Sequence, residues 1–245
     1  MNFTVILAAT CVFVLVAANS IKAVPWLWYG LACAVDIVYA YGIVYSLPPM
    51  VLRILSVTVQ RCLLATALFA VVMYCGVFSE QSAVRRRIGP IRAELSIMAC
   101  ILAFAHCLNY LESYLGVLSR NVAVVSANQL ASLVLAIVLF ALMVILGVTS
   151  FKKVKHRMKA NVWKAIQRSA YVFFALIYVH ELLVLYPSAT KGAGDAMATC
   201  VAGGIVFALY FVLRFVRYVV DRKRAKVSLC SPEDERGASH AQTSL

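Results

Sequence analysis

The sequence predicts an all-helical, polytopic membrane protein, and three observations lead to this fold class. Of the 245 residues, 63% are hydrophobic and only 13% are charged, with a mean hydropathy of +0.88, whereas roughly a quarter of a typical soluble domain is charged. Apolar runs of roughly 20 residues recur along the chain, and such a run can cross a hydrocarbon core of ~30 Å. The runs lack the alternation of barrel strands, and backbone polar groups in lipid must pair internally, so we expect a helical bundle.

Seven spans are expected along the chain, each an apolar run bounded by polar or turn-forming residues. The tight turn between the second and third spans is expected at Pro48 and Pro49. The expected spans are Phe3 to Ser20, Val24 to Leu47, Val51 to Phe78, Ile91 to Leu115, Val122 to Val148, Trp163 to Leu185 and Met197 to Val219.

The basic residues predict how the spans are oriented. The loops at 85–87 and 152–159 and the tail at 222–226 carry most of the Lys and Arg residues, whereas the opposite side holds only Arg53, Arg120 and Lys191. The positive-inside rule then places the amino terminus outside and the carboxyl terminus in the cytoplasm of a plasma (inner) membrane. The net charge of +13 is thus accounted for by contact with anionic membrane lipid, and no nucleic-acid partner is implied.

The chain divides by composition into three parts. Residues 1–50 are expected to form two amino-terminal transmembrane helices, residues 51–220 the main bundle, and residues 221–245 a disordered cytoplasmic tail. An alternative for the first span is a cleaved signal peptide, because Ser20 to Ala23 resembles a cleavage site. The amino terminus lacks the positive charge of such signals, which favours a membrane span.

Ionisable residues inside spans are costly and therefore point to function. Asp36 and Arg61 each lie about a dozen positions from the turn between spans two and three, which predicts equal depth on neighbouring helices. They either neutralise each other as an ion pair or leave Arg61 to face the anion of a cofactor. Glu94 and Glu112 lie near span ends, where we expect them to reach the membrane surface.

His106 and His180 form the most informative pair. Both lie on spans expected to run outward from the cytoplasm, 14 residues beyond Arg92 and 12 residues beyond Arg168. At about 1.5 Å per residue, both side chains are expected ~20 Å along their helices, in the outer half of the membrane. The sequence therefore predicts two imidazoles at one depth on parallel helices.

Two imidazoles that face each other across a bundle are the axial ligands required by a six-coordinate heme iron. Zinc would need further ligands nearby, and a single membrane histidine more often packs through a hydrogen bond. On this geometry alone, heme ligation and helix packing both remain open. Polar residues near the outer ends are candidate contacts for heme propionates: Tyr110, Tyr114, Arg120 and Lys191.

Several segments around these histidines are similar to a known family. They are Leu63-Leu64-Ala65-Thr66, Arg85-Arg86-Arg87-Ile88-Gly89, Ala105-His106 with Tyr110, Trp163 to Arg168 with Tyr171, and Tyr178-Val179-His180. Over roughly residues 52 to 220 the chain resembles the ferric reductase-like transmembrane domain family, nearest the heme-binding membrane subunit of the periplasmic methionine sulfoxide reductase system. The resemblance implies a b-type heme with His106 and His180 as its axial ligands.

The chain departs from this family at one set of positions. Members commonly carry another histidine 13 residues before the one that matches His180, but that position here is Gln167. Arg92 and Ala93 stand 14 and 13 residues before His106. We therefore expect one heme b per chain, in the outer half of the membrane, rather than two.

The electron donor is expected to come from outside this chain. We expect no separate flavin or nicotinamide domain here, because no glycine-rich phosphate loop follows a strand. A membrane quinol, a flavin bound within the bundle, or a flavoprotein docked on the basic loop 152–164 would fit, although contact with lipid is the simpler interpretation of that loop. The expected function is a cytochrome that relays electrons to an extracytoplasmic acceptor or partner reductase, and the alternative is a non-catalytic scaffold or transporter-like protein with a degenerate heme site.

Overall fold

The computed structural model describes residues 3–45, 47–120 and 126–230, which are almost entirely helical and contain no strand. Five helices are long and apolar enough to cross a membrane, and a bent pair makes a sixth. The chain is therefore a multi-pass membrane protein, as predicted. The helices are α1 (Phe3–Ala23), α2 (Pro25–Tyr45), α3 (Pro49–Leu55), the π-helix η1 (Ser56–Gln60), α4 (Leu63–Tyr74), α5 (Ala83–Ile88), the 3-10 helix η2 (Gly89–Ile91), α6 (Arg92–Arg120), α7 (Ala127–Ser150), α8 (Lys152–Arg157), α9 (Ala160–Ala189) and α10 (Gly194–Cys230).

Each predicted span overlaps a helical segment of the described residues, but the number of spans differs from seven. The first residues of the predicted fifth span, 122–125, lie outside the described residues. The predicted second span corresponds to α2, which is not among the five helices or the bent pair that meet the length and hydropathy requirements. Asp36 and six Trp or Tyr residues interrupt its aliphatic character. The described part of the chain thus supports five or six spans.

Four helices form a ring at the centre of the molecule. α4 packs against α6, α6 against α7, α7 against α9, and α9 against α4. Consequently α6 and α9 lie across the ring from each other and pack mainly through α4 and α7. One buried side chain from each helix, Leu68, Leu102, Leu139 and Phe173, belongs to the same hydrophobic cluster. Cofactor sites of helical bundles are built between such facing helices.

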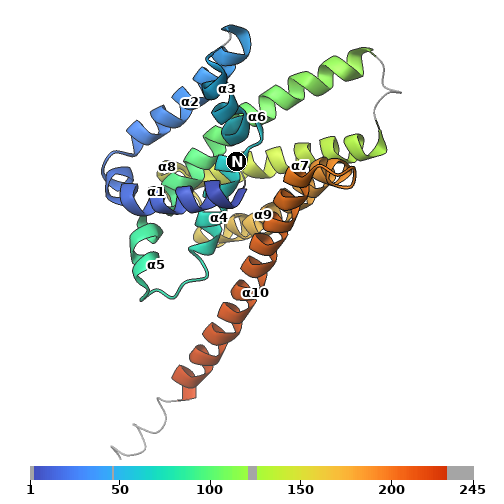
Figure 1. Ribbon diagram of the computed structural model, residues 1–245. Coiled ribbons are helices and arrows are strands. Elements are labelled where there is room, and N and C mark those ends of the chain that lie inside the picture. The colour runs from blue at the N-terminus through green and yellow to red at the C-terminus, as the bar shows by residue number, and fades with distance from the viewer. Residues whose placement is uncertain (1–2, 46, 121–125, 231–245) are drawn as a thin grey trace, which may run out of the picture.

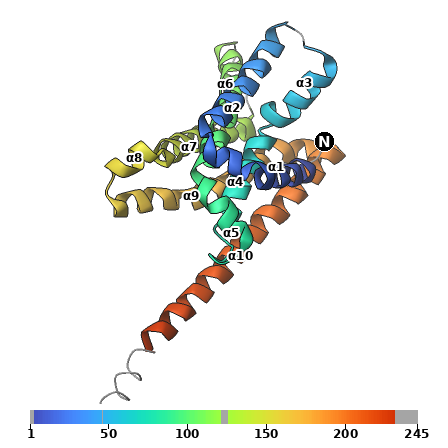
Figure 2. The ribbon, with the colours of Figure 1, turned by 90° about the vertical axis from the view of Figure 1, so that its left-hand side faces the viewer.

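The remaining long helices surround this ring. α1 packs on α4, α2 on α6, and α10 on α9. In both views α10 extends away from the other helices toward its carboxyl end (Figures 1 and 2). Large apolar side chains are exposed along the peripheral helices, as with Val16, Leu31 and Ile205, and lipid is the environment that these surfaces require.

The third predicted span is broken rather than continuous. The segment Pro49–Gln60 and α4 meet at an angle of 44°. Between them, Arg61 leaves the helical conformation and Cys62 adopts a left-handed backbone with φ of 56°. An apolar run of this length predicts a single span, because hydropathy does not register a change in backbone conformation within the run.

Packing inside the ring differs on the two sides of the histidines. On α6, Leu95, Met98 and Leu102 are buried, whereas every side chain from Phe104 to Gly116 is half-buried or exposed. On the inner side α6 and α7 approach closely, since a Cβ placed on Gly147 would lie 3.0 Å from Cys100 Sγ. The side chains of α6 are therefore more deeply buried before His106 than beyond it.

Candidate functional site

His106 is held by a backbone carbonyl from the broken span. Its Nδ1 lies 2.6 Å from the carbonyl oxygen of Gln60. A carbonyl oxygen only accepts hydrogen bonds, so Nδ1 carries the proton and donates it. Nε2 of the neutral ring is then the unprotonated nitrogen, which is the form of imidazole that binds a metal.

The break explains why this carbonyl is available. In a continuous α-helix the Gln60 carbonyl would accept from the amide of Leu64. Here Arg61 N donates to Ser56 O, five residues back, and Cys62 N donates to Val59 O. The altered backbone directs Gln60 O to His106 instead. Left-handed conformation at a non-glycine residue costs about 1–2 kcal/mol and is concentrated at functional sites.

His180 is oriented from the neighbouring helix α7. Ser132 Oγ lies 3.4 Å from His180 Nδ1, a long hydrogen bond, and Ser132 is buried. Both histidines therefore use Nδ1 for a polar partner in the protein. Partners of this kind fix the ring orientation and tautomer of metal-ligating histidines.

The two histidines and two further predicted site residues lie in one region. His106 and His180 are close enough to interact electrostatically. The ring of Tyr110 lies 4.8 Å from that of His106, centroid to centroid. Arg61, at the break, in turn lies close enough to Tyr110 to influence it electrostatically. The structure thus brings Arg61 into the same region as His106 and His180, which follow it by 45 and 119 positions in the sequence.

The ion pair expected between Asp36 and Arg61 is absent from the described residues. Arg61 is exposed, and Asp36 Oδ1 is buried without a hydrogen-bond partner. The prediction of equal depth assumed a continuous third span. Because the span is broken at residues 61–62, residue counts along it no longer give the depth of Arg61. The ion pair is therefore not formed, and the contact of Arg61 with a cofactor anion stays a prediction.

The polar residues near the span ends have different surroundings. Glu94 is buried, and its Oε1 pairs with Lys152 Nζ at 3.1 Å. The prediction that the Glu94 side chain reaches the membrane surface is therefore wrong. Glu112 and Lys191 are exposed, and Tyr114 is half-buried. The side chain of Arg120 lies outside the described residues.

The position of the missing histidine has a structural role here. Gln167 Nε2 donates to Thr149 Oγ1 at 3.0 Å, and Trp163 Nε1 donates to Thr149 O at 3.0 Å. These bonds tie α9 to the end of α7. The described part of the chain also contains no group of three or more His, Cys, Asp or Glu side chains that could hold a metal ion.

Sequence reasoning missed three features of the site. The partners of the histidines, Gln60 O and Ser132, were not expected, nor was the left-handed Cys62. Ser132 gave a readable signal, because it is the only hydroxyl residue in the run from Ala131 to Val148. The backbone carbonyl and the left-handed residue have no signature in composition or periodicity.

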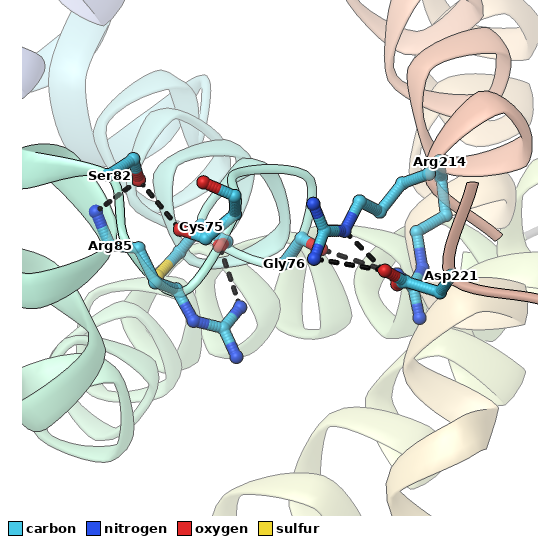
Figure 3. A network of polar contacts seen from close by, with 8 residues as sticks. Cys75, Gly76, Ser82, Arg85, Arg214 and Asp221 are labelled. Atoms are coloured by element: carbon cyan, nitrogen blue, oxygen red, sulfur yellow. Dashed lines mark hydrogen bonds and ion pairs between the residues drawn. The ribbon is translucent and has the colours of Figure 1, made fainter. Parts of the chain in front are cut away.

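A further polar region lies at the other end of the ring. Arg214, inside the predicted seventh span, donates to Tyr171 Oη and to the carbonyl of Gly76. Arg85 donates to the neighbouring carbonyl of Cys75 (Figure 3). Arg214 was not among the intramembrane charges predicted from the sequence, although it and Arg217 both lie inside the predicted span.

Comparisons with known proteins match the central part of the chain. Residues 61–178 match the family model described as ferric reductase like transmembrane component. The match begins at Arg61 and ends two residues before His180. An uncharacterized protein of Treponema pallidum (strain Nichols) is 36% identical over 179 residues, which is 73% of this chain and 49% of that relative.

The chain therefore spans about half the length of this curated relative. No solved structure matches it. The closer resemblance to the membrane subunit of the methionine sulfoxide reductase system is not supported by these comparisons. The predicted resemblance to this family is confirmed for residues 61–178, which contain His106 and Ser132 and are similar to the ferric reductase like transmembrane component.

Proposed function

We propose that His106 and His180 bind a single b-type heme between α6 and α9, and that the chain relays electrons to an extracytoplasmic acceptor or partner reductase. One observation carries the proposal. Each histidine directs Nδ1 to a partner in the protein, Gln60 O at 2.6 Å and Ser132 Oγ at 3.4 Å, which leaves Nε2 as the ligand. Bis-histidine ligation of heme iron has this donor set.

Bound heme would supply a one-electron carrier, and the surrounding residues have separable roles. The Gln60 carbonyl holds the His106 ring and makes its Nε2 more basic. Tyr110 lies beside His106 and Arg61 lies near Tyr110. Both would bind propionate groups through charge and hydrogen bonding. The loosely packed part of α6 beyond Ala103 offers apolar walls for the macrocycle.

The donor that this arrangement favours is lipid-soluble. His106 lies 14 residues along α6 from Arg92, which corresponds to roughly 20 Å of helix. A membrane quinol, or a flavin within the bundle, approaches the histidine pair more closely than a flavoprotein docked on the basic loops.

Absorbance of the purified full chain tests the proposal. We expect a Soret band that shifts on dithionite reduction, together with its loss or conversion to a five-coordinate spectrum in His106→Ala and His180→Ala. His156→Ala is the matched control, since His156 lies exposed on α8, and its spectrum should equal that of the wild type. A colourless but well-folded protein would instead support the alternative, a non-catalytic scaffold or transporter-like protein with a degenerate heme site.

A further inference from the structure

A second polar site lies at the end of the ring opposite the histidines. A cavity of about 250 Å³ opens where the carboxyl end of α4, the start of α6, and helices α9 and α10 meet. Arg92, at the start of α6, lines it, and His106 lies 14 residues further along the same helix. The cavity and the histidine pair are thus separated by roughly 20 Å of helix.

Positive charge dominates the cavity wall. Four arginines line it, Arg85, Arg92, Arg214 and Arg217, against two acidic residues, Glu80 and Asp221. Asp221 is engaged by Arg217 at 3.0 Å. Within the described ranges none of the other three arginines has a carboxylate within ion-pair distance. With four arginines and two carboxylates on its wall, the cavity carries a net charge of +2.

The arginines are anchored by neutral acceptors, which leaves donors for a ligand. Arg85 Nη1 donates to Cys75 O at 2.8 Å, and Arg214 Nη1 donates to Gly76 O at 3.2 Å. Figure 3 shows these two guanidinium groups beside Cys75 and Gly76, the two residues that follow α4. Carbonyls at a helix end attract cations, so both side chains also cap α4. A guanidinium has five N–H donors, and capping occupies only part of each set.

Tyr171 contributes a hydroxyl donor to the same wall. Its oxygen accepts from Arg214 Nε at 3.1 Å and from Nη2 at 2.8 Å. Because the oxygen accepts both bonds, the phenolic proton remains to be donated. The cavity therefore offers several N–H and O–H donors with excess positive charge, a combination suited to a phosphate anion.

We infer that this cavity binds a phosphate-bearing ligand, and specifically the headgroup of an anionic phospholipid. The cavity borders an apolar surface, since Met73 and Phe78 line it and Val212, Phe215 and Val216 are exposed on α10 nearby in sequence. Acyl chains would cover this apolar surface while the phosphate enters among the arginines. The lipids of a basic membrane face are anionic, which supplies the ligand in the expected orientation.

Binding of three soluble probes to the full chain in maltoside detergent tests this inference. The probes are dioctanoyl phosphatidylglycerol, dioctanoylglycerol with the same chains but no phosphate, and inorganic phosphate, each measured by intrinsic tryptophan fluorescence and native mass spectrometry. We expect saturable binding of the phospholipid, at least about tenfold weaker binding of dioctanoylglycerol, and competition by phosphate at higher concentration. Removal of one charge-assisted hydrogen bond corresponds to about a tenfold loss of affinity.

Neighbouring arginines provide matched variants. Arg85→Gln should weaken phospholipid binding about tenfold, whereas Arg86→Gln, an exposed neighbour outside the cavity wall, should not. Arg92→Gln tests the cavity without removing a cap, because Arg92 makes no side-chain hydrogen bond or ion pair among the residues described. Equal effects of Arg85→Gln and Arg86→Gln, or equal binding of both lipids, would overturn the inference. Binding of phosphate as tight as that of the phospholipid would assign the cavity to a soluble phosphate compound and reject the lipid.

Discussion

At the scale of single residues, the two histidines are set apart from an ordinary pair of packed imidazoles by their polar partners. His106 has an acceptor that cannot donate, so its tautomer is determined by the contact at 2.6 Å. His180 has a hydroxyl partner at 3.4 Å, and a hydroxyl can donate or accept. The tautomer of His180 is therefore less strongly constrained, and we expect it to be the more sensitive ligand.

Ser132→Ala tests the contribution of that hydroxyl. Loss of the Nδ1 partner should leave heme bound but weaken its retention about tenfold, since outer-shell partners of ligating histidines typically contribute 10- to 100-fold. Heme retention during dialysis against apomyoglobin and the midpoint potential measure the effect. Ser132→Thr keeps a hydroxyl and should restore most of the retention.

Ser113→Ala is the control, because its Oγ bonds only to Asn109 O within α6. Retention equal to wild type in Ser132→Ala would mean that α7 does not orient His180.

Prediction from sequence at this scale succeeded where spacing alone decides the outcome. Residue counts along α6 and α9 predicted that His106 and His180 lie at one depth, and these counts hold whenever the helices are regular between the membrane surface and the histidine. Their joint ligation of a heme stays a prediction. The prediction of an ion pair between Asp36 and Arg61 was wrong because it required a regular helix through residues 61–62. The partner carbonyl of Gln60 was inaccessible to prediction for the same reason.

At the scale of the secondary-structure element, the strained backbone at the break in the third span lies next to the residue whose carbonyl holds His106. η1 and the left-handed Cys62 turn one carbonyl out of the helical ladder, and His106 of α6 satisfies it. Broken helices are tolerated at membrane depth where a neighbouring element pairs the freed polar groups. The break and His106 therefore stabilise each other, and alteration of one should affect the other.

Substitutions at Cys62 test this coupling. Cys62→Gly should preserve the break and raise stability by up to about 1 kcal/mol, because glycine enters the left-handed region without strain. Cys62→Val should disfavour that backbone conformation, shift the Gln60 carbonyl and loosen His106. Thermal midpoints and the fraction of six-coordinate heme report the two effects.

Cys107→Val is a control on the neighbouring α6, since it places the same side chain at a regular helical position. If Cys62→Val leaves the heme spectrum unchanged, the backbone at Cys62 does not position His106.

Hydropathy predicted the helical segments to within a few residues at most ends, because lipid exposure demands long apolar runs. It could not distinguish a straight span from one bent by 44°, and it did not detect that α10 continues as a helix to Cys230. Residues 231–245, most of the predicted tail, lie outside the described residues. Arg214 and Arg217 show the same weakness, since averaging over a mostly apolar window conceals two charges near its end.

At the scale of the whole molecule, the ring of α4, α6, α7 and α9 has two chemically different ends. The histidines, Arg61 and Tyr110 lie toward one end, and the arginine-lined cavity lies at the other. The basic loops adjoin the cavity end. If those loops face the cytoplasm, the heme site lies near the outer surface and the phosphate site near the inner leaflet.

Reporter fusions test this orientation. Because 19 basic residues lie on the predicted cytoplasmic side and three on the other, a reporter after Arg157 and one at the carboxyl terminus should read cytoplasmic. A reporter near Lys191, in the turn between α9 and α10, should read extracytoplasmic. An extracytoplasmic signal after Arg157 would reverse the molecule and move the proposed heme to the cytoplasmic half.

Heme stoichiometry tests how far this chain departs from its relatives, and we expect one heme per chain. Gln167 stands where the resemblance predicts the histidine of an inner site, and its Nε2 donates a hydrogen bond to Thr149 Oγ1 at 3.0 Å. The inner part of the ring is also filled, since Leu95, Met98 and Ala99 are buried there. Pyridine hemochrome measurement against protein concentration should therefore give a value near one, and His106→Ala should reduce it toward zero. A value near two would mean that a second heme is held by ligands other than His106 and His180. If His106→Ala then kept one heme, that heme would be the one bound away from His106.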